Sequence, residues 1–105
     1  MNQLSFIGVI AEISVLRYTP AGMPVIELEL DHSSEVEEAG LSRRLNFSIS
    51  AVALGDMALQ LADSPLGAVL KIQGFIAPLR KSSVRLVLHI QQAQVQYSGN
   101  ATVVV

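Results

Sequence analysis

Apolar and polar residues alternate along most of this chain, and a period of two is typical of strands that bury one face. In the clearest example, Ile26, Leu28 and Leu30 fall on one face, while acidic residues occupy the positions between and after them. Five segments have a strand-like pattern: residues 4–16, 25–32, 43–51, 68–77 and 84–97. The pattern therefore predicts five strands.

Glycine and proline mark the places where these segments bend or end. Gly8 and Gly74 lie inside strand-like segments, where a missing side chain indicates a bulge or a close approach of another backbone. The turn between the first two strands contains Pro20, which fixes φ, and Gly22, which can adopt a positive φ. Residues 33–40 are polar and acidic and end in glycine, so we expect a loop there.

The spacing changes from strand to helix only between residues 51 and 62, where apolar residues are mixed with alanine and few are β-branched. Gly55 and Asp56 interrupt this stretch. We therefore expect the helix to cover residues 56–62, with Asp56 as its cap.

Five strands with one short helix between the third and the fourth predict an all-β protein. The order is that of a five-stranded Greek-key OB-fold barrel, a fold that binds oligonucleotides or oligosaccharides. A six-stranded barrel or a small sandwich is the alternative. The predicted domain covers residues 1–97, followed by a C-terminal tail at residues 98–105.

Composition limits the possible classes of protein. Half of the 105 residues are hydrophobic, which suffices for one compact core. There is no cysteine, so disulfides and thiolate metal sites are excluded. No apolar run reaches about 18 residues, and the first residues lack a basic segment, so we expect a cytoplasmic protein without a signal peptide or membrane span. The formal net charge of −2 argues against a generally basic nucleic-acid binder.

The distribution of cations still allows a nucleic-acid site. Single-strand binders combine a cationic track with aromatic rings on which bases stack. Tyr18 is the best candidate for an exposed ring, because Phe6 and Phe47 follow the apolar phase and are predicted to lie in the core. Six cations fall on five predicted elements that border one groove in an OB barrel: Arg17, Arg44, Lys71, Arg80, Lys81 and Arg85. Dispersed surface charge is the alternative interpretation.

Residues suited to catalysis are few. Only His32 and His89 could carry protons near neutral pH, and no catalytic or nucleotide-binding motif accompanies them. We interpret both as structural, and Glu27 and Glu29 as solubilising charges on an outer strand face. No enzyme activity, cofactor or metal is predicted, although a small hydrolase or sugar-binding barrel remains an alternative.

The first strand carries large apolar residues on both faces, and one small core cannot bury both. Val9, Ile13 and Val15 are therefore the candidate residues of a dimer interface. The alternative is a coiled strand that buries both faces where the barrel closes.

Several motifs, in this order, resemble the primosomal replication protein N (PriB) family. They are LxFxGxI from Leu4, the turn at residues 17–24, EEAG at 37–40, QGF at 73–75 and LVLH at 86–89. The resemblance spans nearly all of residues 3–97. The turn alone is also similar to bacterial single-stranded-DNA-binding protein, a related OB-fold, whereas the EEAG, QGF and LVLH set is more specific.

The resemblance implies a homodimer of OB-folds that binds single-stranded DNA and bridges the primosomal helicase, PriA, to it during replication restart. Other primosome proteins are further candidate partners. The family pattern has a tryptophan where this chain has Asn46, which cannot stack on a base. The candidate nucleic-acid-binding residues are Arg17, Tyr18, Arg44, Asn46, Lys71, Arg80, Lys81, Arg85 and His89. The alternative function is a primosome adaptor that binds mainly protein, with incidental DNA binding.

Overall fold

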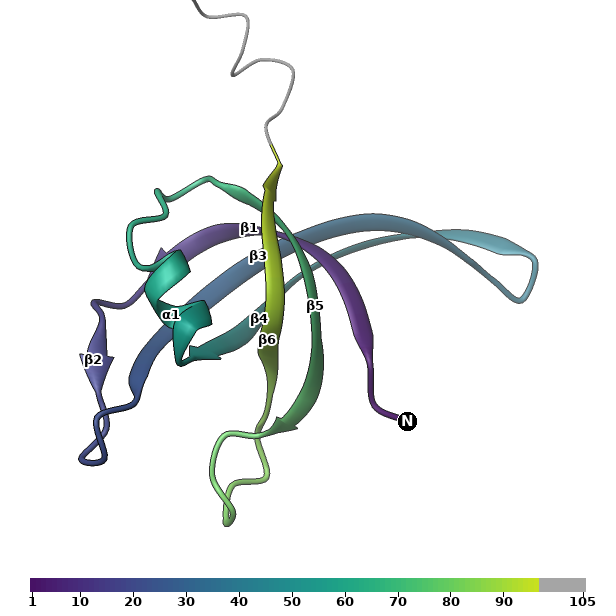
Figure 1. The fold of residues 1–105 in the computed structure, drawn as a ribbon. Helices are drawn as coiled ribbons and strands as arrows, with labels where there is room; N and C mark the ends of the chain where they lie inside the picture. The colour runs from purple at the N-terminus through teal and green to yellow at the C-terminus, as the bar shows by residue number, and fades with distance from the viewer. Residues whose placement is uncertain (97–105) are drawn as a thin grey trace, which may run out of the picture.

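The computed structural model of the chain describes residues 1–96, so the predicted tail at residues 98–105 lies outside the described part (Figure 1). The elements, in chain order, are β1 (Leu4–Ile13), β2 (Arg17–Tyr18), β3 (Pro24–Glu38), β4 (Leu41–Leu54), α1 (Asp56–Leu61), β5 (Val69–Pro78) and β6 (Leu86–Gln96). No helix in residues 1–96 is long and apolar enough to cross a membrane.

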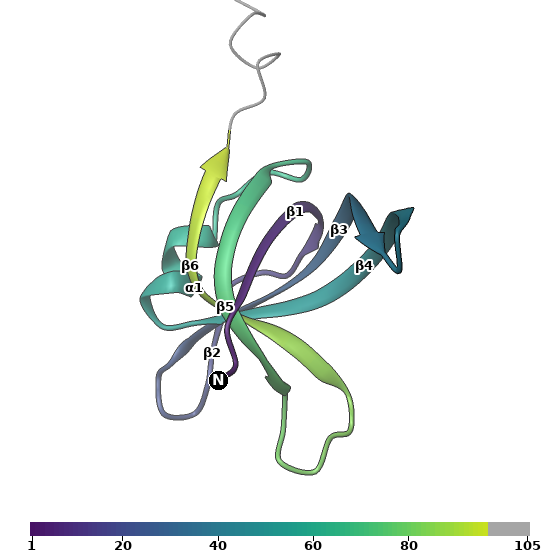
Figure 2. The same ribbon diagram turned by 90° about the vertical axis from the view of Figure 1, so that its right-hand side faces the viewer.

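Five of the strands form a closed ring. The neighbours run β1, β5, β6, β4 and β3, and β3 pairs again with β1, while the short β2 pairs only with β3. All pairs are antiparallel except β4 with β6, which is parallel. Figure 2 shows these strands curving around a common centre. This order of strands around the ring confirms the predicted OB-fold. The helix α1 lies between β4 and β5, which are the third and fourth ring strands along the chain.

The core lies inside the ring and follows the predicted alternation. Ile26, Leu28 and Leu30 of β3 are at most 4% exposed. The largest fully buried side chains come from four strands: Ile10, Ile26, Leu30, Leu70, Ile72 and Leu88. Met57 and Leu61 of α1 join the same cluster, so the helix packs against the core.

Two glycines lie where backbones pass closely. A Cβ on Gly8 would lie 3.1 Å from the Cβ of Leu30, so Gly8 marks a close approach. The bulge in β1 lies at Ala11 instead, between the pairs Ile10↔Leu30 and Glu12↔Glu29. At Gly74 the register of β5 against β6 shifts, and a Cβ there would overlap the carbonyl oxygen of His89.

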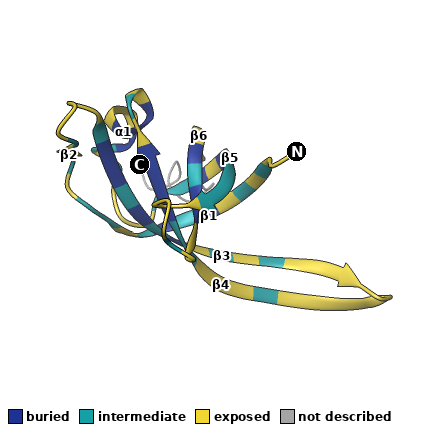
Figure 3. Cartoon of the chain, turned by 90° about the horizontal axis from the view of Figure 1, so that it is seen from below, coloured by how far each residue is buried: buried dark blue, intermediate teal, exposed yellow. Residues whose placement is uncertain are grey.

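The acidic segment at residues 33–40 is not the predicted loop. β3 pairs with β4 without interruption from Val25↔Leu54 to Glu38↔Leu41. The chain reverses at Ala39 and Gly40, both with positive φ, as in a two-residue hairpin turn. The far half of this hairpin, residues 33–46, extends from the body and is largely exposed (Figure 3). We call residues 33–46 the projecting ribbon.

Two predicted element ends were also wrong. β1 stops at Ile13, and at the next residue the Ser14 hydroxyl, in place of a backbone carbonyl, accepts from the N–H of Glu27 at 2.9 Å. β4 continues to Leu54, and α1 begins with Asp56 as its first residue. Gly55, with φ 69°, occupies the cap position, so Asp56 is not the cap.

The turn before β3 forms as predicted. Gly22 has a φ of 88°, and its N–H donates to the Thr19 carbonyl at 2.8 Å. The Thr19 hydroxyl also accepts from the N–H of Met23 at 3.1 Å. This turn fixes the position of β2 beside β3.

Candidate functional site

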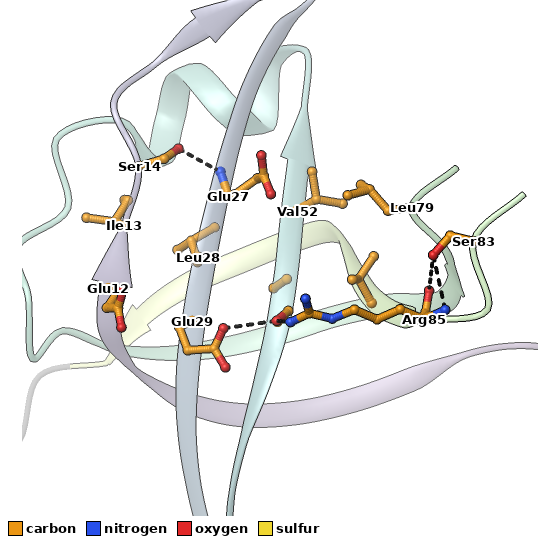
Figure 4. Close-up of a pocket in the computed structure, with 13 residues that line it drawn as sticks. Glu12, Ile13, Ser14, Glu27, Leu28, Glu29, Val52, Leu79, Ser83 and Arg85 are labelled. Atoms are coloured by element: carbon orange, nitrogen blue, oxygen red, sulfur yellow. Dashed lines mark hydrogen bonds between the residues drawn. The ribbon is translucent and has the colours of Figure 1, made fainter. Parts of the chain in front are cut away.

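A hollow of about 430 Å³ lies on the outer face of β3 and β4 (Figure 4). The end of β1 borders it, as does the connection between β5 and β6 at residues 79–85. Its lining consists of Glu12, Ile13, Ser14, Glu27, Leu28, Glu29, Ser50, Ala51, Val52, Leu79, Ser83, Arg85 and Val87. We call it the central hollow.

Strand alternation determines which side chains point into the hollow. Leu28 is in the core, so its neighbours Glu27 and Glu29 point outward. On β4, Ser50 lies opposite Glu29, and Val52 lies opposite Glu27. The site thus follows from the same pattern that builds the core.

The floor of the hollow is apolar. Val52 and Val87 are only 2% and 4% exposed, although both lie outside the ring. With Val25 they form a small buried cluster separate from the main core. No aromatic side chain from residues 1–96 lines the hollow.

Arg85 is held in place by hydrogen bonds. Its Nη2 donates to Ser50 Oγ at 2.6 Å, and Ser50 Oγ donates to Glu29 Oε2 at 2.9 Å. The backbone N–H of Arg85 donates to Ser83 Oγ at 3.1 Å. The guanidinium is therefore fixed over β4, linked to Glu29 through a hydroxyl.

Carboxylates outnumber cations in the central hollow. Glu12, Glu27 and Glu29 line it, with Arg85 as the single cation among the lining residues. Arg17 lies at the border, where its Nη2 is 2.6 Å from Glu27 Oε2 in a half-exposed ion pair. Within residues 1–96, Glu12 has neither a side-chain hydrogen bond nor an ion pair. The hollow is thus not the positive groove expected from the sequence.

The six predicted cations do not all meet at this hollow. Arg80 and Lys81 are exposed in the same connection as Arg85, and the Arg80 carbonyl accepts from the N–H of Ser83 at 3.0 Å. Arg44 lies on the projecting ribbon, opposite Glu35. Lys71 is exposed on β5, in register with residues of β1 and β6. Arg85 therefore lines the hollow and Arg17 reaches its border through Glu27, whereas Arg80 and Lys81 belong to the same connection as Arg85 without lining the hollow. Arg44 and Lys71 lie apart.

The aromatic residues were predicted only in part. Tyr18 is 59% exposed, as expected, and Phe6 packs against the core. Phe47, predicted to be in the core, is 44% exposed. The reason is that β4 leaves the ring near this residue, so the inner face has no opposite strand. Phe47 instead lies 5.0 Å from the ring of His32, centroid to centroid.

The two histidines differ in their environment. His32 is satisfied structurally, because Nδ1 donates to the Ile7 carbonyl at 2.7 Å and Nε2 lies 2.8 Å from Ser34 Oγ. His89 stacks on Phe75 with ring centroids 4.8 Å apart, and its buried Nε2 has no partner among residues 1–96. No group of three or more His, Cys, Asp or Glu side chains in this part of the chain is placed to hold a metal ion.

The remaining candidates are dispersed. Asn46 lines a separate hollow on the β3–β4 pair. Of the candidate interface residues, Ile13 packs against the core, Val9 is half-buried and Val15 is 83% exposed. Ile13 therefore contributes to the core, and the interface of a dimer stays a prediction.

Sequence reasoning missed the roles of Glu12, Ser50 and Leu79. Ser50 could have been found, because alternation places it on the outer face next to the two glutamates. Glu12 and Leu79 reach the hollow only through the pairing of distant segments.

Comparisons with known proteins agree with the fold. Residues 2–92 match the model of a family described as another single-strand binding protein family. The replication restart protein PriB of Bordetella pertussis is 55% identical over 94 residues, covering 90% of this chain and 88% of the relative. PriB of Nitrosomonas europaea is 36% identical over 94 residues, covering 90% and 87%.

Solved structures give the same result. The structure of PriB from Ralstonia solanacearum superimposes with a TM-score of 0.84 at 35% identity, covering 92% of this chain and 99% of that one. The wild-type single-stranded DNA binding protein of Thermus aquaticus has a TM-score of 0.78 at 19% identity, covering 95% of this chain and 52% of that one. At that identity, the second likeness concerns the fold alone.

Proposed function

The chain belongs to the PriB family of replication restart proteins, and from this premise we propose that it binds single-stranded DNA as an accessory protein of the replication-restart primosome. We further propose that it bridges a primosomal helicase, PriA, to that DNA in the cytoplasm and acts by binding alone, without catalysis. The family and the OB-fold support this proposal together.

The single observation that carries the DNA-binding proposal is the position of Arg85. Oligonucleotides bind OB-folds on the face that corresponds to β3 and β4 here, between the loops that follow the first strand and precede the last. Arg85 is fixed on that face, in the connection that also holds Arg80 and Lys81. These three residues form the proposed DNA track, with Arg17 and Tyr18 at the border of the hollow.

We expect this binding to be weak and sensitive to salt. The track is short, and the carboxylates beside it repel phosphates. Arg44, Asn46, Lys71 and His89 lie off the track, so they contribute less to binding in this proposal than the sequence indicated.

A fluorescence titration of labelled oligo-dT tests the assignment. Arg85→Ala should weaken binding clearly at low salt, whereas Lys71→Ala, the same loss of charge on another face, should have a smaller effect. Equal effects of the two substitutions would contradict the proposed DNA track. An unchanged oligo-dT affinity in Arg85→Ala would contradict the central role of Arg85.

A primosome adaptor with incidental DNA binding is the second candidate function. The acidic character of the central hollow favours it, because a face that binds DNA alone has no use for Glu12, Glu27 and Glu29. Measuring helicase binding and oligo-dT binding at the same salt concentration separates the two functions.

We also propose that the protein is a homodimer. Within residues 1–96, residues 4–8 of β1 have a strand partner, β5, along one edge only. On the other edge the Ile7 carbonyl accepts from His32, and the remaining backbone groups are available to a second strand. Beside this edge, one face of the β3–β4 hairpin exposes Val36 and Leu41 on the projecting ribbon and Phe47 just beyond it, at 40%, 70% and 44%. An open strand edge next to an exposed apolar face supports contact with a second copy.

A further inference from the structure

We propose that the central hollow is a docking site for an extended, cationic segment of a protein partner, with an arginine or lysine flanked by apolar side chains. This inference rests on the proposed adaptor role and gives the chemistry of the partner. It does not require DNA binding.

The strongest evidence is a pair of like charges. Glu12 of β1 lies directly opposite Glu29 of β3 in the strand register. Carboxylates opposite one another on adjacent antiparallel strands repel, and such pairs destabilise a sheet. The bulge at Ala11 creates this pairing, because without it Glu12 would lie opposite Leu28.

Within residues 1–96, no cation forms a direct ion pair with Glu12 or Glu29. The partner of Glu29 is the Ser50 hydroxyl, which links it to Arg85 without a direct ion pair. In Figure 4 the Glu29 carboxylate points toward Ser50 and Arg85, and Glu12 lies beside β1, on the other side of the β3 backbone. A guanidinium or ammonium from outside would therefore find two acceptors with spare capacity.

The lining also selects against nucleic acid in the hollow itself. Bases bind OB-folds by stacking on aromatic side chains, and the lining contains none. Its floor consists of Val52 and Val87, with the half-exposed Leu79 at the wall. Aliphatic floor and acidic wall together match an amphipathic peptide rather than a polynucleotide.

Geometry allows both ligands to bind at once. The proposed DNA track follows the connection at residues 79–85, and Glu12 lies on β1, at the opposite wall of the hollow. Glu29 lies between them and is linked to Arg85 through Ser50. A partner segment whose cation binds over Glu12 and Glu29 would bring its own positive charge beside the track. Partner binding is then expected to strengthen DNA binding rather than to block it.

The test uses two short capped peptides with the full chain, one of alternating leucine and arginine and one of alternating leucine and glutamate. Backbone amide shifts in NMR locate the site, and calorimetry gives the affinity. We expect the arginine peptide, but not the glutamate peptide, to shift amides around the hollow. The double variant Glu12→Gln and Glu29→Gln should weaken that binding about tenfold or more.

A matched control separates local from general electrostatics. Glu35→Gln with Glu37→Gln removes the same charge from the projecting ribbon and should leave peptide binding unchanged. Glu12→Gln alone, at an exposed position, provides a second variant, and a thermal melt verifies folding of each protein.

Three outcomes would overturn the inference. The first is equal weakening by the hollow and ribbon variants. The second is displacement of the bound arginine peptide by oligo-dT, and the third is a shift of the amides of the hollow with protein concentration alone, which would assign the hollow to a second copy. Loss of oligo-dT binding in Arg85→Ala tests the DNA track separately, so the two proposals can fail independently.

Discussion

Among the glycines, Gly74 has the least room for a side chain. A Cβ at this position would overlap the backbone of His89, which cannot move without breaking the pairing of β5 with β6. We expect Gly74→Ala to lower the free energy of unfolding by about 3 kcal/mol, as for a strongly overpacked core. Urea unfolding measures the change.

Gly8→Ala is the control for this substitution. Its new Cβ would meet mainly the Leu30 side chain at 3.1 Å, and a side chain can shift slightly. A smaller loss of stability is therefore expected. Equal losses at Gly8 and Gly74 would show that backbone overlap is not the cause.

Glu27 restrains one of the cations that border the hollow. Removing its charge in Glu27→Gln leaves Arg17 without its ion-pair partner and removes one source of repulsion for phosphates. We expect roughly fivefold tighter oligo-dT binding at low salt, since one charge near contact is worth about 1 kcal/mol in water.

Stability should change by less than about 1 kcal/mol in this variant, because the pair is half-exposed. Glu37→Gln on the ribbon removes the same charge at a distance. If the oligo-dT affinity rises equally in both variants, the net charge of the protein, and not the position of Glu27, sets the affinity. An unchanged affinity in Glu27→Gln would contradict the role given to Glu27.

The projecting ribbon exposes large apolar side chains that nothing within residues 1–96 covers. Leu41 is 70% exposed on its apolar face, and Ser42 lies next to it on the polar face. If the ribbon contributes to a dimer, Leu41→Glu should shift sedimentation at micromolar concentration towards the monomer. Ser42→Glu, with the same added charge on the other face, should leave the wild-type dimer intact.

A wild-type protein that is monomeric at that concentration would contradict the proposed homodimer. Dimers unaffected by Leu41→Glu would instead restrict it to the open edge of β1.

Elements were predictable from the sequence wherever burial follows alternation, as with Leu28 in β3. The ribbon was missed because its strands bury little, so their polar composition resembled a loop. Phe47 was misplaced for a related reason. The alternating pattern shows on which face of its strand a residue lies, but not whether another strand covers that face. The pairing of Glu12 with Glu29 depends on a bulge at Ala11, which only the assembled sheet reveals.

For the whole molecule, charge is arranged in two neighbouring zones on one face. Arg80, Lys81 and Arg85 occupy one connection, and the carboxylates of the hollow lie across β3 and β4 from it. This arrangement explains how a chain with a net charge of −2 can still attract phosphates locally. It also limits the strength of that attraction, which is why a protein partner is central to the proposed function.

The most direct test of DNA binding by this track is the salt dependence of oligo-dT affinity. Each phosphate contact contributes about 0.7 to the magnitude of the slope of log affinity against log salt concentration. The triple variant Arg80→Ala, Lys81→Ala and Arg85→Ala should therefore bind more weakly, with a slope smaller in magnitude by about 2. An affinity and slope equal to those of the wild-type protein would contradict the DNA track.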